Sequence, residues 1–291
     1  RFESVGTTRV QTAGIQGDGS VRKEDNGTLE FFVDSSYTGT TLINNGVIDI
    51  RTAAGLGTTA GSTTVNGSGT LRLRGGITVA ENLTLNNGDG EGSQGVLRND
   101  ADANILTGTV TLSGTPRIDV DGGTTLTIEG AIGGGGDFFK TDSGTLVLDN
   151  SSNVNTYTGT STIAGGTVII QKDSALGTAA GGTILNAGTS LEFNLAGDYT
   201  VAESLTLGEG ATVINRGSDT DLATTSITLQ GDATIESATA GTTFSTAANI
   251  DLGFGNLTVI GDGDTSLTGD ISNTAFVNDG NGNFFASGLI E

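Results

Sequence analysis

Carboxylates are the main chemistry-bearing side chains of this 291-residue sequence, because it contains no histidine and no cysteine. The sequence therefore lacks the residues for Ser-His-Asp or Cys-His catalysis, and it lacks the usual zinc ligands. The pairs Asp119/Asp121 and Asp100/Asp102 stand two residues apart, so on a strand both carboxyls of a pair face the same side. Two such carboxyls can serve as acid and base of a polysaccharide hydrolase when their pKa values differ.

Other features count against that carbohydrate-active alternative. Acids on the outer face of an acidic, repetitive β protein are normally solvated, and the chain offers only three lysines to accompany them, Lys23, Lys140 and Lys172. We therefore predict a protein that is not an enzyme and has no catalytic residue, and keep a carbohydrate-active β-helix enzyme as the weaker alternative.

Two Gly-rich segments place oxygen ligands at alternate positions, as loops that bind hard cations do. They are Asp262-Gly263-Asp264 and Asn278–Asn283. The candidate metal ligands are Asp262, Asp264 and Asp279, and the candidate cation is calcium. Ordinary Asn/Asp/Gly turns are the competing interpretation, and no other cofactor is expected.

The composition is acidic and poor in large apolar residues. Twelve basic residues face 33 acidic ones, for a net charge of −21 and a pI near 4.1. Nucleic-acid binding needs a basic footprint, so no nucleic-acid partner is expected, and neither is an anionic membrane surface. No apolar run reaches the roughly 18 residues of a membrane helix, which predicts no direct membrane insertion. Because the chain begins at Arg1 and not at methionine, we expect a processed or excised segment.

A long tandem repeat organises the chain. Three segments recur further along it: 23–29 at 140–146, 37–40 at 157–160, and 78–85 at 200–207. These offsets define a repeat of about 120 residues. The prediction is a single β-solenoid over residues 1–291, with copy 1 at about 15–127, copy 2 at about 132–247 and a partial third copy at 248–291.

Short segments with alternating apolar and polar residues fill each copy. Val47–Ile50, Thr70–Leu73 and Arg117–Val120 are examples, and Gly, Asn and Asp turns separate them. Such strands fit a sandwich, a barrel or a solenoid, but a sandwich does not copy its whole strand set within one core. The sequence therefore predicts an all-β fold, a parallel β-helix. Five coils of about 24 residues in each repeat would give about 12 coils in all.

Four segments of copy 2 together resemble the autotransporter-associated β-strand repeat. They are Ser143–Leu148, Tyr157–Thr160, Ile163–Ile170 and Ala175–Gly177, with Asn155 at the asparagine position of the pattern. Copy 1 departs from the pattern, since Ser35-Ser36 stands where the asparagine belongs. The resemblance covers about a quarter of the chain.

The resemblance implies a right-handed parallel β-helix from an autotransporter passenger, exported through an outer-membrane barrel and displayed outside the cell. It supplies no catalytic residues. Residues 284–291 lack the strand pattern of such a barrel, so we expect a passenger fragment, or a secreted relative with another anchor.

The resulting function hypothesis is a non-catalytic extracellular structural or adhesive β-helix, a cell-surface stalk or passenger segment. The alternative is a self-assembling subunit of a filament or surface layer that stacks through its β-helix ends. The partners expected are other copies of the chain, end to end or side by side, and glycans or proteins of a host or neighbouring cell surface. Irregular loops at residues 86–95 and 151–155 are the expected adhesive positions.

Overall fold

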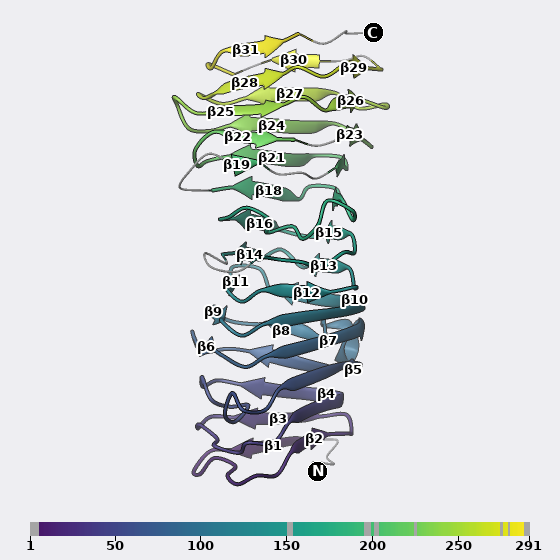
Figure 1. The fold of residues 1–291 in the computed structure, drawn as a ribbon. Helices are drawn as coiled ribbons and strands as arrows, with labels where there is room; N and C mark the ends of the chain where they lie inside the picture. The colour runs from purple at the N-terminus through teal and green to yellow at the C-terminus, as the bar shows by residue number, and fades with distance from the viewer. Residues whose placement is uncertain are drawn as a thin grey trace. The chain divides into compact units, whose positions relative to one another are not determined.

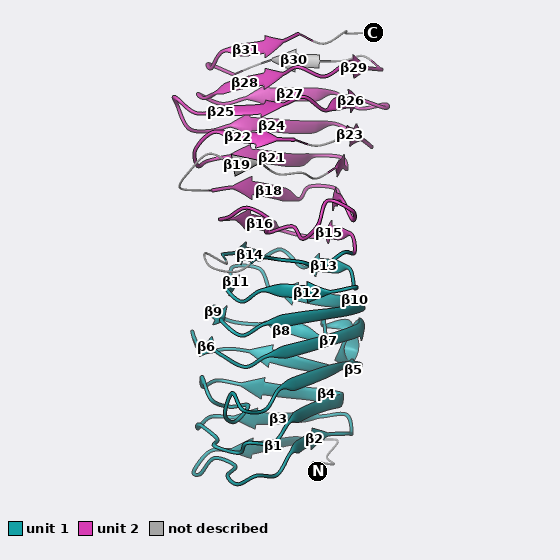
Figure 2. Ribbon diagram, viewed as in Figure 1, with its two compact units in different colours: residues 1–158 teal, residues 159–291 magenta. Residues whose placement is uncertain are grey.

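The computed structural model describes residues 6–149, 154–194, 199–200, 204–223, 226–273, 276–278 and 280–287. The chain is an all-β parallel solenoid of about 12 turns, as the sequence predicts (Figure 1). In the described residues no helix is long and apolar enough to cross a membrane. The chain divides into two compact units, residues 1–158 and 159–291, which Figure 2 colours separately. This division lies within copy 2 of the repeat and not at either end of it.

Unit 1 contains fourteen strands among its described residues and one short 3-10 helix, η1. Their bounds are β1 Thr7–Val10, β2 Val21–Lys23, β3 Thr28–Phe31, β4 Thr41–Ile50, β5 Thr63–Leu73, β6 Thr78–Val79, β7 Leu83–Gly88, η1 Glu91–Ser93, β8 Leu97–Asn99, β9 Ala103–Leu106, β10 Val110–Val120, β11 Thr125–Ile128, β12 Ile132–Gly134, β13 Phe138–Thr141 and β14 Thr145–Leu148.

The strands of unit 1 pair in parallel with strands of the preceding and following coils. One sheet runs β1-β3-β4-β5-β7-β10-β13, with β2, β8 and β12 pairing beside this path. A further face runs β6-β9-β11-β14. The long strands β4 and β10 shift register between Ile43 and Asn45 and between Ser113 and Pro116, so each turns a corner between two faces.

Unit 2 has the same construction on three faces, β15-β17-β20-β23-β26-β29, β16-β18-β21-β24-β27-β30 and β19-β22-β25-β28-β31. The bounds are β15 Ser161–Ile163, β16 Thr167–Ile170, β17 Thr183–Leu185, β18 Ser190–Phe193, β19 Tyr199–Thr200, β20 Leu205–Leu207, β21 Ala211–Asn215, β22 Thr220–Leu222, β23 Ser226–Leu229, β24 Ala233–Ser237, β25 Thr243–Thr246, β26 Asn249–Asp251, β27 Leu257–Ile260, β28 Asp264–Leu267, β29 Ile271–Ser272, β30 Phe276–Asn278 and β31 Phe284–Ala286.

The core consists of columns of aliphatic side chains, one residue from each coil. In unit 1 a column runs Leu29, Ile48, Leu71, Leu97, Ile118, each pairing with the next. All five are at most 1% exposed. Alternation at period two sends every second side chain into this narrow core, which is why short branched residues suffice and large aromatics are few.

The coils are slightly shorter than the sequence suggests. The column that begins at Leu29 reaches Lys140 after five steps of strand pairing. A coil therefore takes about 22 residues, within the usual size of solenoid units, and not about 24. Five coils fall short of one repeat, so the repeat partner of Leu29, Leu146, lies on the next face, in β14. A motif that occurs in both copies can therefore lie on different faces of the solenoid.

Two of the repeat motifs of the sequence lie in the corners between faces. Tyr37 is 1% exposed, and its hydroxyl lies 2.6 Å from the Thr41 hydroxyl, to which it is hydrogen-bonded. Gly57 lies on the Tyr37 ring with φ +89°, and a Cβ there would stand 2.5 Å from the Tyr37 carbonyl oxygen. The Tyr-Thr-Gly-Thr and Ala-Leu-Gly type motifs are thus two halves of one corner packing.

The asparagine of the pattern accepts a backbone hydrogen bond, and the serine of copy 1 does the same. Asn155 is 2% exposed, and its Oδ1 accepts a hydrogen bond from the Ile132 N–H at 2.8 Å. In copy 1, Ser35 Oγ accepts from the Ile15 N–H at 3.1 Å. Either side chain therefore satisfies a backbone donor of the preceding coil.

Candidate functional site

A column of charged side chains runs along the outside of unit 1. Six residues in successive coils pair in register, each with the next: Arg9, Glu30, Asp49, Arg72, Arg98 and Asp119. Further charged residues stand two positions away on the same strands or directly after them: Arg51, Arg74, Asp100, Arg117 and Asp121. We call these eleven residues the Arg–carboxylate ladder. It exists because register pairing brings equivalent outward positions about 4.8 Å apart.

Short ion pairs connect the coils of the ladder. Arg9 Nε lies 2.6 Å from Glu30 Oε2, and Arg72 donates to Asp49 Oδ2 from Nε at 2.9 Å and from Nη2 at 2.7 Å. Arg98 donates two hydrogen bonds to Asp121, from Nε to Oδ1 at 2.9 Å and from Nη2 to Oδ2 at 2.6 Å. Such two-pronged guanidinium–carboxylate contacts are the strongest exposed ion pairs.

The centre of the ladder is dry although it lies on the outside of the coils, since its side chains cover one another. The Asp49 side chain is 0% exposed, and three guanidinium groups surround it: those of Arg51, Arg72 and Arg74, with nitrogens 3.5, 2.7 and 3.6 Å from Oδ2. Its Oδ1 is buried without a hydrogen-bond partner in the described structure. A buried carboxylate needs such cations, because an unpaired one would be costly.

Three of the four carboxylates considered for catalysis belong to this ladder. Asp119 is 4% exposed, with Arg117 Nε 2.8 Å from its Oδ1 and the Thr141 hydroxyl donating to the same oxygen. Asp121 is held by Arg98, and Asp100 by Arg74 and Arg98. Burial raises the pKa of Asp119 above its ordinary value, and Arg117 opposes that shift.

The fourth carboxylate, Asp102, has another task. It occupies a turn with φ +66°, and its Oδ2 accepts the Gly75 N–H at 2.9 Å. In the structure all four carboxylates therefore bind an arginine or a backbone N–H of the protein itself. These contacts hold neighbouring coils in place. These four residues do not form a pair of open carboxyls facing a cleft.

Two of the calcium candidates, Asp262 and Asp264, lie just before β28 and at its first residue, near the end of unit 2. Asp262 Oδ1 accepts from the Asn281 amide at 3.0 Å, and Asp264 Oδ1 from the Asn283 N–H at 2.8 Å. Asp279 lies outside the described residues. Within the described part of the chain no group of three or more His, Cys, Asp or Glu could hold a metal ion.

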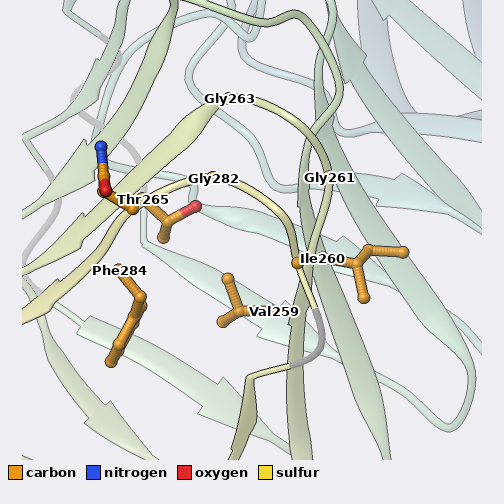
Figure 3. Close-up of a pocket in the computed structure, with 9 residues that line it drawn as sticks. Val259, Ile260, Gly261, Gly263, Thr265, Gly282 and Phe284 are labelled. Atoms are coloured by element: carbon orange, nitrogen blue, oxygen red, sulfur yellow. The ribbon is translucent and has the colours of Figure 1, made fainter.

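Figure 3 labels Gly261 and Gly263 in one glycine turn and Gly282 in the neighbouring one. A Cβ on Gly282 would lie 1.8 Å from the Gly263 carbonyl oxygen, so glycine is required for the coils to approach. The gap that Val259, Thr265 and Phe284 line has no room for a water-sized sphere. These turns are closely packed backbone, and the calcium assignment stays a prediction.

Two buried lysines repeat at equivalent positions and were missed as functional residues by sequence reasoning. Lys140 is 0% exposed, and its Nζ donates to the carbonyls of Asp142 and Gly144, both at 2.6 Å. Lys23, 1% exposed, donates to the Asp25 carbonyl. Burial lowers the pKa of Lys140 to about 8 and also lowers the pKa of Lys23. In both copies the ammonium group therefore holds the turn that precedes the Gly-Thr-Leu strand.

The two expected adhesive loops differ in what the structure shows. In residues 86–95 the amide of Asn86 donates to Asn66 Oδ1 at 2.7 Å, and Glu91–Ser93 forms η1. Of the second loop, residues 151–153 lie outside the described residues, Val154 is 60% exposed, and Asn155 is the buried corner residue described above.

Comparison with known proteins identifies the repeat. A family model described as passenger-associated-transport-repeat matches residues 21–50 and 138–170. Two segments of the chain are thus similar to this repeat. Each match begins at the first residue of a strand that contains one of the buried lysines, β2 or β13, and ends at the last residue of β4 or β16. The resemblance to autotransporter passengers read from the sequence is thereby confirmed.

The chain is also similar to the Adhesin BmaC autotransporter of Brucella suis biovar 1 (strain 1330). The two are 33% identical over 172 residues, which is 59% of this chain and 4% of that protein. The chain thus spans a small fraction of its relative's length. No solved structure matches. The passenger repeats and this relative indicate a cell-surface or extracellular location.

Proposed function

We propose that this chain is a non-catalytic segment of an extracellular adhesive passenger, in which the solenoid acts as a stalk that carries adhesive surface. The observation that carries the proposal is the pair of passenger-associated transport repeats on a parallel solenoid. The similarity to a protein named an adhesin supports it.

The Arg–carboxylate ladder supports the non-catalytic part of the proposal. Half of the 12 basic residues of the chain belong to it. Three of these six, Arg74, Arg98 and Arg117, pair with acids that a hydrolase would need. A general acid–base pair requires carboxyls within reach of a substrate. The carboxylates of the ladder bond neighbouring coils instead.

Adhesion is tested with fluorescent beads that carry the folded chain. We expect these beads to bind epithelial monolayers in numbers well above beads that carry a scrambled chain of the same composition and net charge. Equal binding by the two kinds of bead would remove the adhesive role and leave a spacer. Release of reducing sugar from surface polysaccharides by the wild-type chain would instead restore the carbohydrate-active alternative.

Self-assembly is the second candidate, in which other copies of the chain replace glycans or proteins of neighbouring cells as partners. The observation in its favour is that β6, inside the chain, pairs with one strand only in the described structure, β9. Unpaired parallel strand edges can template further strands. Sedimentation velocity at increasing concentration decides between them: filaments or a rising sedimentation coefficient support assembly, and a constant monomer value contradicts it.

A further inference from the structure

A half-open pocket of about 320 Å³ in unit 1 is separate from the Arg–carboxylate ladder. We call it the Glu81 pocket. Ala54, Leu56, Thr58, Ala80 and Glu81 are among its lining residues. Its volume falls at the lower end of the range of small-molecule sites.

The pocket exists because the strand ladder is interrupted at this point. β6, Thr78–Val79, pairs with β9 and is the last strand of its sheet. In the preceding coil the corresponding segment, residues 53–59, forms turns, and it bonds the coil on its other side through Ser35 N–H to Ala54 O at 2.9 Å and Thr58 N–H to Tyr37 O at 2.9 Å. The turns leave one edge of β6 unpaired and a space beside it.

Glu81 is the one ionisable side chain among the residues that line the pocket. The residue is 4% exposed, and Thr63 donates from Oγ1 to its Oε1 at 3.3 Å. In the described part of the chain no lysine or arginine pairs with it. Burial raises its pKa to about 7, and the phenol of Tyr37 is the other titratable group that its charge influences. The hydroxyl of Thr58 is buried without a partner in the described structure.

We propose that the Glu81 pocket binds a primary ammonium group on a short aliphatic stem, which is either a free alkylamine or a lysine side chain of a partner protein. The apolar walls suit the methylene stem, and the buried carboxylate lacks a cation of its own among the described residues. An ammonium group there would form a charge-assisted hydrogen bond in a largely dry setting. The net charge of −21 attracts cations toward the chain.

The two sources of the ammonium group differ in what else they offer. A lysine peptide in extended conformation can pair its backbone with the free edge of β6 while its side chain enters the pocket, the usual manner of strand addition. A free alkylamine uses the pocket alone.

The test is calorimetric titration at pH 8 with n-butylamine and with a blocked Gly-Lys-Gly peptide as separate probes. We expect saturable 1:1 binding of at least one probe to the wild-type chain. Glu81→Gln should weaken it at least tenfold, whereas Glu129→Gln, which removes the same charge elsewhere in unit 1, should leave it unchanged. At pH 6 binding should be about tenfold weaker, because the Glu81 carboxyl is then mostly protonated while the amine stays charged.

A second variant guards against a folding defect in Glu81→Gln. Ala80→Leu keeps the carboxyl and narrows the pocket from its exposed rim, and it should also weaken binding with an unchanged thermal unfolding midpoint. Binding of n-butylamine, with or without the peptide, assigns the pocket to free amines, and binding of the peptide alone assigns it to a lysine-bearing partner. No binding by either probe, or equal binding by wild type and Glu81→Gln, overturns the proposal.

Discussion

The arginines of the ladder and the two buried lysines lie where coils meet, and each has a carboxylate or a backbone carbonyl as its partner. Asp49 has three arginines around it, Arg98 holds Asp121 in two bonds, and Lys140 bonds two backbone carbonyls. A chain with a net charge of −21 thus places half of its basic residues in one ladder. The consequence is that individual substitutions here should have effects typical of buried charges.

Replacing Asp49 by asparagine should destabilise unit 1 by about 3 kcal/mol, because three guanidinium groups would remain close together without their carboxylate. Urea unfolding measures the change. The control is Asp18→Asn, an exposed acid whose contact with the Thr38 hydroxyl is 3.3 Å long, and it should change the free energy of unfolding by less than about 0.5 kcal/mol. Equal effects of the two substitutions would show that the ladder contributes no more than an ordinary surface charge.

Lys140 predicts a pH dependence of stability with a definite sign. Its pKa is about 8 in the folded chain and 10.5 in the unfolded one, so between these values the unfolded chain binds more protons. The free energy of unfolding should therefore rise with pH in this window, by up to about 3 kcal/mol for a shift of this size.

The measurement is the free energy of unfolding of wild type minus that of Lys140→Met, at pH 7.5, 9 and 10. Subtraction removes the contribution of other groups, including Tyr37, whose pKa is raised to about 12. The difference should increase with pH. A flat or falling difference would mean that the carbonyl bonds of the ammonium group outweigh the loss of its hydration.

The calcium prediction is tested by removal of the ion. If Asp262 and Asp264 bind calcium, the unfolding temperature should rise on addition of about 2 mM Ca²⁺, by roughly 2–4 °C for about 1 kcal/mol of binding energy. The rise should be absent in Asp262→Asn/Asp264→Asn and after EGTA treatment. The same unfolding temperature with Ca²⁺ and with EGTA would leave these residues as ordinary turn formers.

At the scale of elements, the corners carry the Tyr-Thr-Gly-Thr and Ala-Leu-Gly type motifs. The strands require only alternation, which many residues satisfy, but each corner has one tight contact. Gly57 on Tyr37 and the Asn155 or Ser35 bond to the preceding coil are such contacts. This explains why Tyr-Thr-Gly-Thr recurs unchanged in both copies.

Gly57→Ala should destabilise the protein by at least about 2 kcal/mol more than Gly17→Ala, because only the first introduces a clash with backbone. Both glycines have positive φ, +89° and +97°, so alanine is strained at either position. At Gly57 the new Cβ would also stand 2.5 Å from the Tyr37 carbonyl oxygen, whereas at Gly17 nothing lies within 4 Å. Thermal unfolding of the two variants checks this, and equal shifts would refute the corner contact.

For the whole molecule, the sequence sufficed for the all-β class, the solenoid and the passenger repeat, because alternation and tandem copies are local properties of the chain. The expected coil was slightly too long, since dividing the repeat by five assumes that a repeat closes on the face where it began. The path from Leu29 to Lys140 shows that it does not.

The ladder and the Glu81 pocket could not be predicted because both depend on register between coils. Asp49 and Arg72 pair across neighbouring coils, and no local sequence pattern predicts this pairing. A partial signal existed, since Arg72-Leu73-Arg74, Arg98-Asn99-Asp100 and Arg117-Ile118-Asp119 repeat a charged, inward, charged pattern at about coil spacing. The pocket has no such signal, because it results from turns that replace a strand.

The central claim is that successive coils stack in register at intervals of about 22 residues, and electron–electron distance measurements test it most directly. In unit 2 one outward column runs Thr162, Ile184, Thr206, Thr228, Asp251, Ser272. The chain has no natural cysteine, so spin labels can be placed on Thr162→Cys/Ser272→Cys and on Thr162→Cys/Asp251→Cys. Five and four steps predict narrow distributions whose centres differ by about 4.8 Å, with the longer at about 24 Å between backbones. Broad distributions, or two pairs at the same distance, would contradict the stacked solenoid.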